Sequence, residues 1–287
     1  MGVNRYSYHF TEHLPAVEIL EQIYAGTANL ETLLQDVRAQ LAFRLVVASI
    51  AEEANLVFEQ AFVQAVVSSP LALRLLLSNR GACRALVHST VFLDAVVANS
   101  TALTIVNSSR FLVQAWWEQL AFAPAIERYG QFVPSLVETN LLALFIQRRP
   151  EIVMSGPFLR GIWDSDAAIA QISPPSIREH FRSHPNFFIL TYNKPSNNTW
   201  NDIPGLTGRH LLLGWSSNNA PISYPFELQT LRSGSNLVAT NLHSGSTANT
   251  GTDARQGSVL PLEAPYQLRT PVNPGSVTYY LALLPVP

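Results

Sequence analysis

Side chains whose types and spacing could do chemistry are few in this sequence. His180 and His184 are four residues apart, so a helix would place both imidazoles on one face, where they could contribute to a metal site. No His-Glu-x-x-His pattern accompanies them, and Pro185 follows directly. With two ligands at most, the sequence predicts no bound metal and no other cofactor.

Carboxylates are equally scattered. Sugar hydrolysis needs two carboxylates that flank the scissile bond. Those of the last third of the chain lie on separate predicted turns and strands, and they are Asp202, Glu227, Asp253 and Glu263. The Gly-x-Ser-x-Gly nucleophile pattern, the Gly-x-x-x-x-Gly-Lys phosphate loop and the dinucleotide fingerprint are absent. We therefore expect a protein that is not an enzyme.

Aromatic and amide side chains of the same region favour binding. An aromatic ring offers a flat face to a sugar, and Asn side chains can bond sugar hydroxyl groups. Trp215 and Tyr279 lie inside apolar predicted strands, so we expect them in the core. Trp200 lies in a turn-rich segment, for which exposure, a subunit contact and burial are all open. The candidate ligand-binding residues are Trp200, Asn201, Asn218 and Tyr224.

Composition limits the possible partners. Of 287 residues, 47% are apolar, which is ample for a core, and 13% are charged, against roughly a quarter in an ordinary soluble domain. The 18 basic and 20 acidic residues lack the basic excess of proteins that bind nucleic acid. Cys83 is the single cysteine, so no internal disulfide forms. Apolar runs are too short for a membrane span, and we expect no membrane insertion.

The organisation of the chain changes near Pro185. Upstream lie 16 of the 20 acids together with helix-forming Ala, Leu, Gln and Glu, whereas Ser, Thr, Asn, Gly and Pro dominate downstream. This contrast predicts a multidomain α+β protein with an all-α first part. The predicted parts are a helical assembly or docking region (1–67), short helical repeats and longer helices (68–149), a connector with one short helix (150–185) and an antiparallel, jelly-roll-like β-sandwich (186–287).

Helical spacing runs through residues 30–67. Apolar residues recur there at intervals of four, three and four, as in a helix packed along another helix, and they are Leu30, Leu34, Val37 and Leu41. An ordinary core helix explains this seam, and so does an interface between copies of the chain. Low charge and two-sided apolar strands favour a homotrimer, because closed symmetry buries surface that a monomer would expose.

Between Ser68 and Gln114 the sequence repeats with a period near ten or eleven. Each unit opens with a small polar residue that can cap a helix of about two turns, and the units begin at Ser69, Ser78, Ser89, Ser100 and Ser109. Helices this short are unstable alone, so the units must stack as a solenoid or an array. Residues 115–149 read as longer helices.

Seven strands are predicted after Pro185, at residues 186–192, 209–215, 224–231, 237–242, 258–262, 266–270 and 277–284. Both faces of the last one are apolar, so it is either central in its sheet or lies against another subunit. The loop from Ser244 to Gln256 has almost no apolar residue and is expected to be a mobile tip.

Several short segments of the sequence resemble segments found in one family. Ser100-Thr-Ala-Leu and Ala95-Val-Val-Ala-Asn-Ser resemble the degenerate Ala-Val-Ala-Ala-Ser-Ser-Thr-Ala-Met repeats of structural proteins of tailed bacteriophages, with Leu or Phe where that family often has Met. Three further segments resemble the β-rich domain that follows those repeats in tail-fibre or tail-tip proteins, and they are residues 188–193, 211–216 and 228–235.

The resemblance implies a virion protein, made in the host cytoplasm and acting in the phage tail. The expected function is that of a tail fibre or receptor-binding component that adheres to a host surface glycan through its β-domain. A capsid decoration or baseplate protein that contacts other virion proteins is an alternative. A lectin-like glycan-binding module is another, but it gives no reason for the helical repeats.

Overall fold

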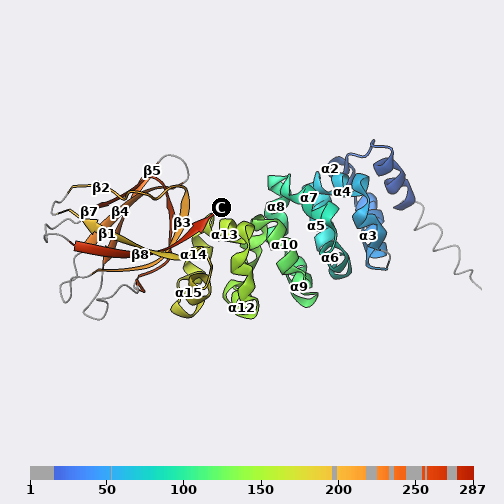
Figure 1. Ribbon diagram of the computed structural model, residues 1–287. Helices are drawn as coiled ribbons and strands as arrows, with labels where there is room; N and C mark the ends of the chain where they lie inside the picture. Colours follow the sequence, from blue (N-terminus) through green and yellow to red (C-terminus); the bar gives the residue numbers. More distant parts are fainter. Residues whose placement is uncertain are drawn as a thin grey trace, which may run out of the picture. The chain divides into compact units, whose positions relative to one another are not determined.

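The computed structural model describes residues 16–52, 54–195, 199–217, 225–232, 236–243, 254–255, 257–269 and 277–287. The chain divides into two compact units, Met1–Thr139 and Asn140–Pro287. The fold is mixed α+β, as the composition predicts. Helices form the first unit and begin the second, and antiparallel sheets follow them (Figure 1).

Helices in the first unit are short and closely spaced. They are a helix at residues 16–24, here named the N-terminal helix, then α2 (Leu30–Leu33), α3 (Val37–Glu52), η1 (Ala54–Phe58), α4 (Gln60–Val67), α5 (Pro70–Leu77), α6 (Arg80–Leu86), α7 (Thr90–Val97), α8 (Ser100–Asn107), α9 (Arg110–Glu118), α10 (Phe122–Arg128), η2 (Gly130–Phe132) and α11 (Val133–Glu138). The predicted array of short helices is confirmed, and no helix of the array exceeds nine residues from α4 to α11.

A polar cap begins each helix of the repeat. The capping side chain accepts a hydrogen bond from the amide three residues later, and the caps of α5 to α9 are Ser69, Asn79, Ser89, Asn99 and Ser109. The predicted starts at Ser69, Ser89 and Ser109 are confirmed. Those at Ser78 and Ser100 are wrong by one residue, because an adjacent Asn serves as the cap equally well.

Three successive helices make one coil of a solenoid. Each helix packs on the third one along the chain: α3 on α6 and α6 on α9, α4 on α7, α5 on α8 and α8 on α11. α10 is likewise joined to α7, the third helix before it. The Arg128 guanidinium at the end of α10 bonds the Asp94 carboxylate on α7 at 3.2 Å. A ten-residue repeat is therefore one side of a three-sided coil.

Two of these caps also bond the backbone of the preceding coil. Ser89 Oγ accepts from the amide of Phe92 in its own helix and donates to the carbonyl oxygen of Val57 in the coil below. Asn99 accepts from Ala102 N and donates through Nδ2 to Val67 O at 3.3 Å. Ser89 is fully buried, so one hydroxyl satisfies two backbone groups that water cannot reach.

The predicted seam is corrected by the structure. A new helix starts within it, because the Asp36 carboxylate accepts from the amides of Arg38 and Ala39 at 2.8 and 3.0 Å. Leu30 and Leu34 are buried inside the protein, whereas Val37 and Leu41 of α3 are 69% and 59% exposed. The four residues therefore form no continuous stripe on one helix.

Two segments differ from the predicted helices: longer helices were expected at residues 115–149, and a connector with one short helix at residues 150–185. At residues 115–149, α9 ends at Glu118 and three further short α-helices follow, the last of them α12 (Leu142–Arg148). Leu120 and Asn140 lie between these helices with φ angles of +54° and +55°. Residues 150–185, predicted as a connector with one helix, contain η3 (Pro150–Met154), α13 (Gly156–Trp163), α14 (Asp166–Ile172) and α15 (Pro175–Arg182). Ser155 and Ser165 cap α13 and α14, so the same local signal continues through this segment.

All seven predicted strands are present, with shifted ends, and a two-residue strand is added. They are β1 (Phe188–Lys194), β2 (Asn201–Asp202), β3 (Arg209–Ser217), β4 (Pro225–Arg232), β5 (Asn236–His243), β6 (Leu260–Glu263), β7 (Tyr266–Arg269) and β8 (Val277–Val286). They form two antiparallel sheets with the strand orders β1-β8-β3-β6 and β2-β7-β4-β5. Most of the loop at 244–256 lies outside the described residues.

One apolar core lies between residues of both sheets. Trp215, Tyr279 and Leu281 of the first sheet pack in one cluster with Leu228 and Leu268 of the second. Trp215 and Tyr279 are 3% and 0% exposed, which confirms their predicted place in the core.

Helices of the same unit cover the other face of the first sheet. Ala282 and Leu284 alternate with the core residues of β8 and are fully buried, and α13 contacts this strand while α15 contacts β3. Trp163 Nε1 donates to Leu262 O at 3.1 Å, and the buried Arg178 guanidinium donates to Leu213 O and Gly257 O. β8 is therefore central in its sheet and covered on both faces by its own unit.

Replacement of Ser89 by Ala should destabilise the protein by about 2–4 kcal/mol. The cap contributes about 1 kcal/mol, and the loss of the inter-coil bond leaves the Val57 carbonyl buried without its donor at about 1–3 kcal/mol. Asn79→Ala is the matched control, because Asn79 caps α6 in the same way with no bond to another coil, and it should cost about 1 kcal/mol. Urea unfolding of both variants gives the comparison, and equal losses would contradict the second role of Ser89.

Candidate functional site

The predicted ligand-binding residues divide between described and undescribed parts of the chain. Trp200 and Asn201 are described, and Asn218 and Tyr224 lie outside the described residues. Trp200 and Asn201 are both half-buried, at the start of β2. The candidate site is built around these two residues, at the end of the second sheet.

Strand pairing brings an arginine to Trp200. Asn201 pairs with Leu268 in the antiparallel register of β2 and β7, so Trp200, one residue earlier, lies across from Arg269, one residue later. The Arg269 guanidinium carbon is 4.6 Å from the centre of the Trp200 ring, a cation–π contact. Because the ring is half-buried and held by this contact, part of it faces solvent in a restrained position.

Polar side chains border the ring. Asp202 pairs with Gln267 across the two strands, and its Oδ1 accepts from Gln267 Nε2 at 2.8 Å. Asn201 pairs with the core residue Leu268 and therefore belongs to the opposite face, where its side chain donates to Thr199 O at 2.7 Å. Burial, and then the negative charge of Asp202, raise the pKa of the neighbouring Tyr192 phenol. The site thus combines one aromatic ring with a cation, an anion and one amide.

Sequence reasoning missed Gln267 and Arg269. The available signal is the alternation in β7, where Tyr266 and Leu268 are buried in the core and the residues between and after them point the other way. The sequence does not show that β7 pairs with β2, so it could not bring these two residues to Trp200.

A second polar cluster lies inside the β region. Tyr266 OH donates to Gly208 O at 2.6 Å, so its single proton is used, and His210 Nδ1, at 3.0 Å, donates to the phenol oxygen. The Phe188 and Tyr266 rings both meet the imidazole edge to face. Both His210 and Tyr266 are buried, and burial lowers the pKa of His210 and raises that of Tyr266. Because both side chains are buried, this hydrogen-bonded pair is part of the core.

The predicted geometry of the histidine pair is wrong. α15 ends at Arg182, so His184 lies beyond the helix, and its Nδ1 accepts from the Asn186 amide at 3.0 Å. No cluster of three or more His, Cys, Asp or Glu side chains occurs in the part of the chain that the structure describes.

The predicted carboxylates are also dispersed. Glu263 pairs with Arg209 at 3.2 Å, and the Arg209 guanidinium lies 4.5 Å from the centre of the Trp163 ring. Asp202 belongs to the Trp200 site. The Glu227 side chain and Asp253 are outside the description.

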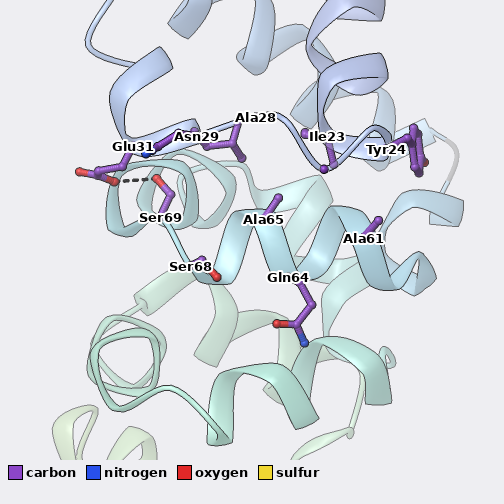
Figure 2. A pocket seen from close by; sticks show the side chains of 12 residues that line it. Ile23, Tyr24, Ala28, Asn29, Glu31, Ala61, Gln64, Ala65, Ser68 and Ser69 are labelled. Atoms are coloured by element: carbon purple, nitrogen blue, oxygen red, sulfur yellow. Dashed lines mark hydrogen bonds between the residues drawn. The ribbon is translucent and has the colours of Figure 1, made fainter.

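A groove of about 550 Å³ lies between the first coil of the described chain and α4 (Figure 2). One side is the segment from Ile23 to Glu31, and the other is the outer face of α4 with Ala61, Gln64 and Ala65. The Glu31 carboxylate at its end accepts from Ser69 Oγ at 2.6 Å and from Leu71 N at 3.1 Å, and these bonds lower the pKa of Glu31. Glu31 therefore caps α5 and holds α2 in place.

Among described residues, no single helix is long and apolar enough to span a membrane. Two bent helix pairs, α4 with α5 and α7 with α8, pass the same test by length and composition. Their inward faces form the core of the solenoid.

Comparison of the sequence with models of known protein families and with curated proteins finds no match.

Stability should fall in mild acid. Because burial lowers the pKa of His210, the unfolded chain takes up a proton at a higher pH than the folded protein. The contribution of this histidine to the free energy of unfolding is complete above pH about 6.5. It declines below that pH, with a slope of at most about 1.4 kcal/mol per pH unit.

His210→Gln tests this assignment, since an amide can still donate to Tyr266. Denaturant unfolding between pH 5 and 8 should show a smaller decline in the variant than in the wild type. The remaining decline belongs to His184, whose pKa burial also lowers. Identical declines in the two proteins would show that His210 does not carry the effect.

Proposed function

We propose that this protein is a structural and adhesive component, in which the helical solenoid is a spacer and the β region holds a glycan-binding surface around Trp200. The observation that carries the proposal is the restrained, partly exposed Trp200 ring beside Arg269, with Asp202 and Gln267 at the next positions on the same face of the strand pair. Binding of this kind involves no turnover.

A sugar is the ligand class that this chemistry suits. The carbon–hydrogen face of a pyranose stacks on an indole ring, and carboxylate, amide and guanidinium groups bond the hydroxyl groups around it. The charges of Asp202 and Arg269 offset each other, so a neutral glycan is favoured over a strongly charged one.

We further propose that the two sheets form a β-sandwich. Residues of both sheets share one core, and the helices α13 and α15 cover the outer face of the first sheet. Such a body holds its strand ends rigidly, and rigid elements position binding side chains better than free loops do.

The solenoid suits the role of a spacer. Each helix contacts mainly its neighbours in adjacent coils, so every further coil lengthens the stack by about the 8–10 Å that separates packed helices. Together with the resemblance of the repeats and the β words to tailed-phage proteins, this supports a virion component of tail-fibre or receptor-binding type.

Trp200→Ala should weaken glycan binding roughly tenfold or more, because the stacking surface is removed. A glycan array probed with the full chain identifies a ligand, and titration with that ligand measures the change. Tyr280→Ala is the matched control, because Tyr280 is another half-buried aromatic of the β region and lies in the other sheet.

The melting temperature of Trp200→Ala should stay close to that of the wild type. Equal binding by both variants, or no glycan bound by the wild type, would reject the glycan site.

A cryo-electron density map of the intact particle tests the virion proposal. We expect the β region to project from the tail. A position between capsomers would reject adhesion in favour of capsid decoration, and a position in the baseplate would favour contacts with other virion proteins. If the chain is absent from purified particles, the tail, capsid and baseplate roles are all rejected, and a lectin-like module remains.

A further inference from the structure

The helix α3 exposes a second apolar face. Phe43, Val46 and Val47 are buried on the side that packs on α6. On the other side three large apolar residues recur at four-residue intervals, and they are Val37 at 69%, Leu41 at 59% and Leu45 at 38% exposure. We name these three residues with Arg38 and Arg44, which are also exposed, the α3 face.

The place of α3 in the solenoid explains why this face is uncovered. The N-terminal helix, α2 and α3 form the first coil of the described chain, so no described coil lies on their outer side (Figure 1). Terminal coils of repeat proteins usually carry a polar outer surface, because an apolar one invites stacking. Three large apolar side chains in a row depart from that rule and indicate a contact surface.

The N-terminal helix offers a complementary surface. It buries Ala16, Ile19 and Ile23 and turns its opposite side to solvent. Exposed there are Val17 at 48% and Tyr24 at 50%, together with the exposed carboxylates of Glu18 and Glu21. We name these four exposed residues the acidic face.

The charges of the two faces are opposite. The described side chains of α3, from Val37 to Ile50, include Arg38 and Arg44 and no acid, whereas the N-terminal helix carries Glu18 and Glu21 and no base at residues 16–24. Two α3 faces packed on each other would bring like charges together at an apolar contact, which is unfavourable. An α3 face and an acidic face would match in both apolar spacing and charge.

We propose that the acidic face of one copy of this chain packs on the α3 face of a neighbouring copy. Each copy carries one surface of each kind, so the contact repeats from copy to copy and closes into a ring when the rotation permits. A trimer, as expected from the sequence, is one such ring. The proposal is independent of the glycan site, because it rests on the first unit alone.

The first experiment measures the mass of the full chain in solution by sedimentation over a range of concentrations. We expect an oligomer of defined size in the wild type and at least a tenfold weaker association in Leu41→Asp. Phe111→Asp is the matched control, because Phe111 is a 45% exposed aromatic on α9 outside both faces, and it should associate like the wild type.

Charge reversal identifies the partner of the α3 face. The double variant Arg38→Glu, Arg44→Glu should dissociate, since it sets four acids against one another. Addition of Glu18→Arg and Glu21→Arg to the same chain should restore the wild-type mass. Thermal unfolding of each variant shows that the monomer remains folded, as expected for substitutions at exposed positions.

A monomeric wild type at all concentrations would overturn the proposal and assign the α3 face to a contact within the chain or with a different protein. An oligomer that the four-residue variant fails to restore would overturn the pairing of the two faces. Loss of glycan binding in Trp200→Ala with unchanged mass would leave this proposal intact.

Discussion

An α-helix of seven or eight residues does not remain folded by itself in water, so the solenoid depends on the contacts that each helix makes with the coil beneath it. Ser89 provides one such contact, because its buried hydroxyl caps α7 and also bonds the backbone of η1. Asn99 repeats the arrangement one side further along the coil. A cap recurs at each ten-residue step, and at Ser89 and Asn99 the residue that starts the helix also bonds the preceding coil.

The second unit solves a different problem, which is how to bury a strand that is apolar on both sides. Alternate residues of β8 enter the core shared by the two sheets, and those between them lie under helices that precede the sheets in the chain. The buried guanidinium of Arg178 bonds two backbone carbonyls of the β region and thereby fixes α15 to it. The apolar residues on both faces of β8 are thus covered within this unit.

The two candidate surfaces follow from these two arrangements. Trp200 owes its restrained position to the pairing of β2 with β7, at the end of a sheet whose strands are held by the shared core. The α3 face exists because the first coil ends the described solenoid with apolar positions that an additional coil would bury. In the oligomer proposed above, weak binding at each copy of the Trp200 site would add up to avidity.

Local features of this fold were readable from the residues alone. Polar caps at ten-residue spacing predicted the short helices, and alternation predicted the strands and the burial of Trp215 and Tyr279, because caps and strand faces depend on neighbours within a few residues. Tertiary structure decided which apolar residues face inward: Leu30 and Leu34 are buried and Val37 and Leu41 are exposed, although their spacing is that of one helix. It also decided the stacking of every third helix and the meeting of Trp200 with Arg269. These contacts join residues far apart in the chain. They form only when the whole unit folds, so no short segment of the sequence predicts them.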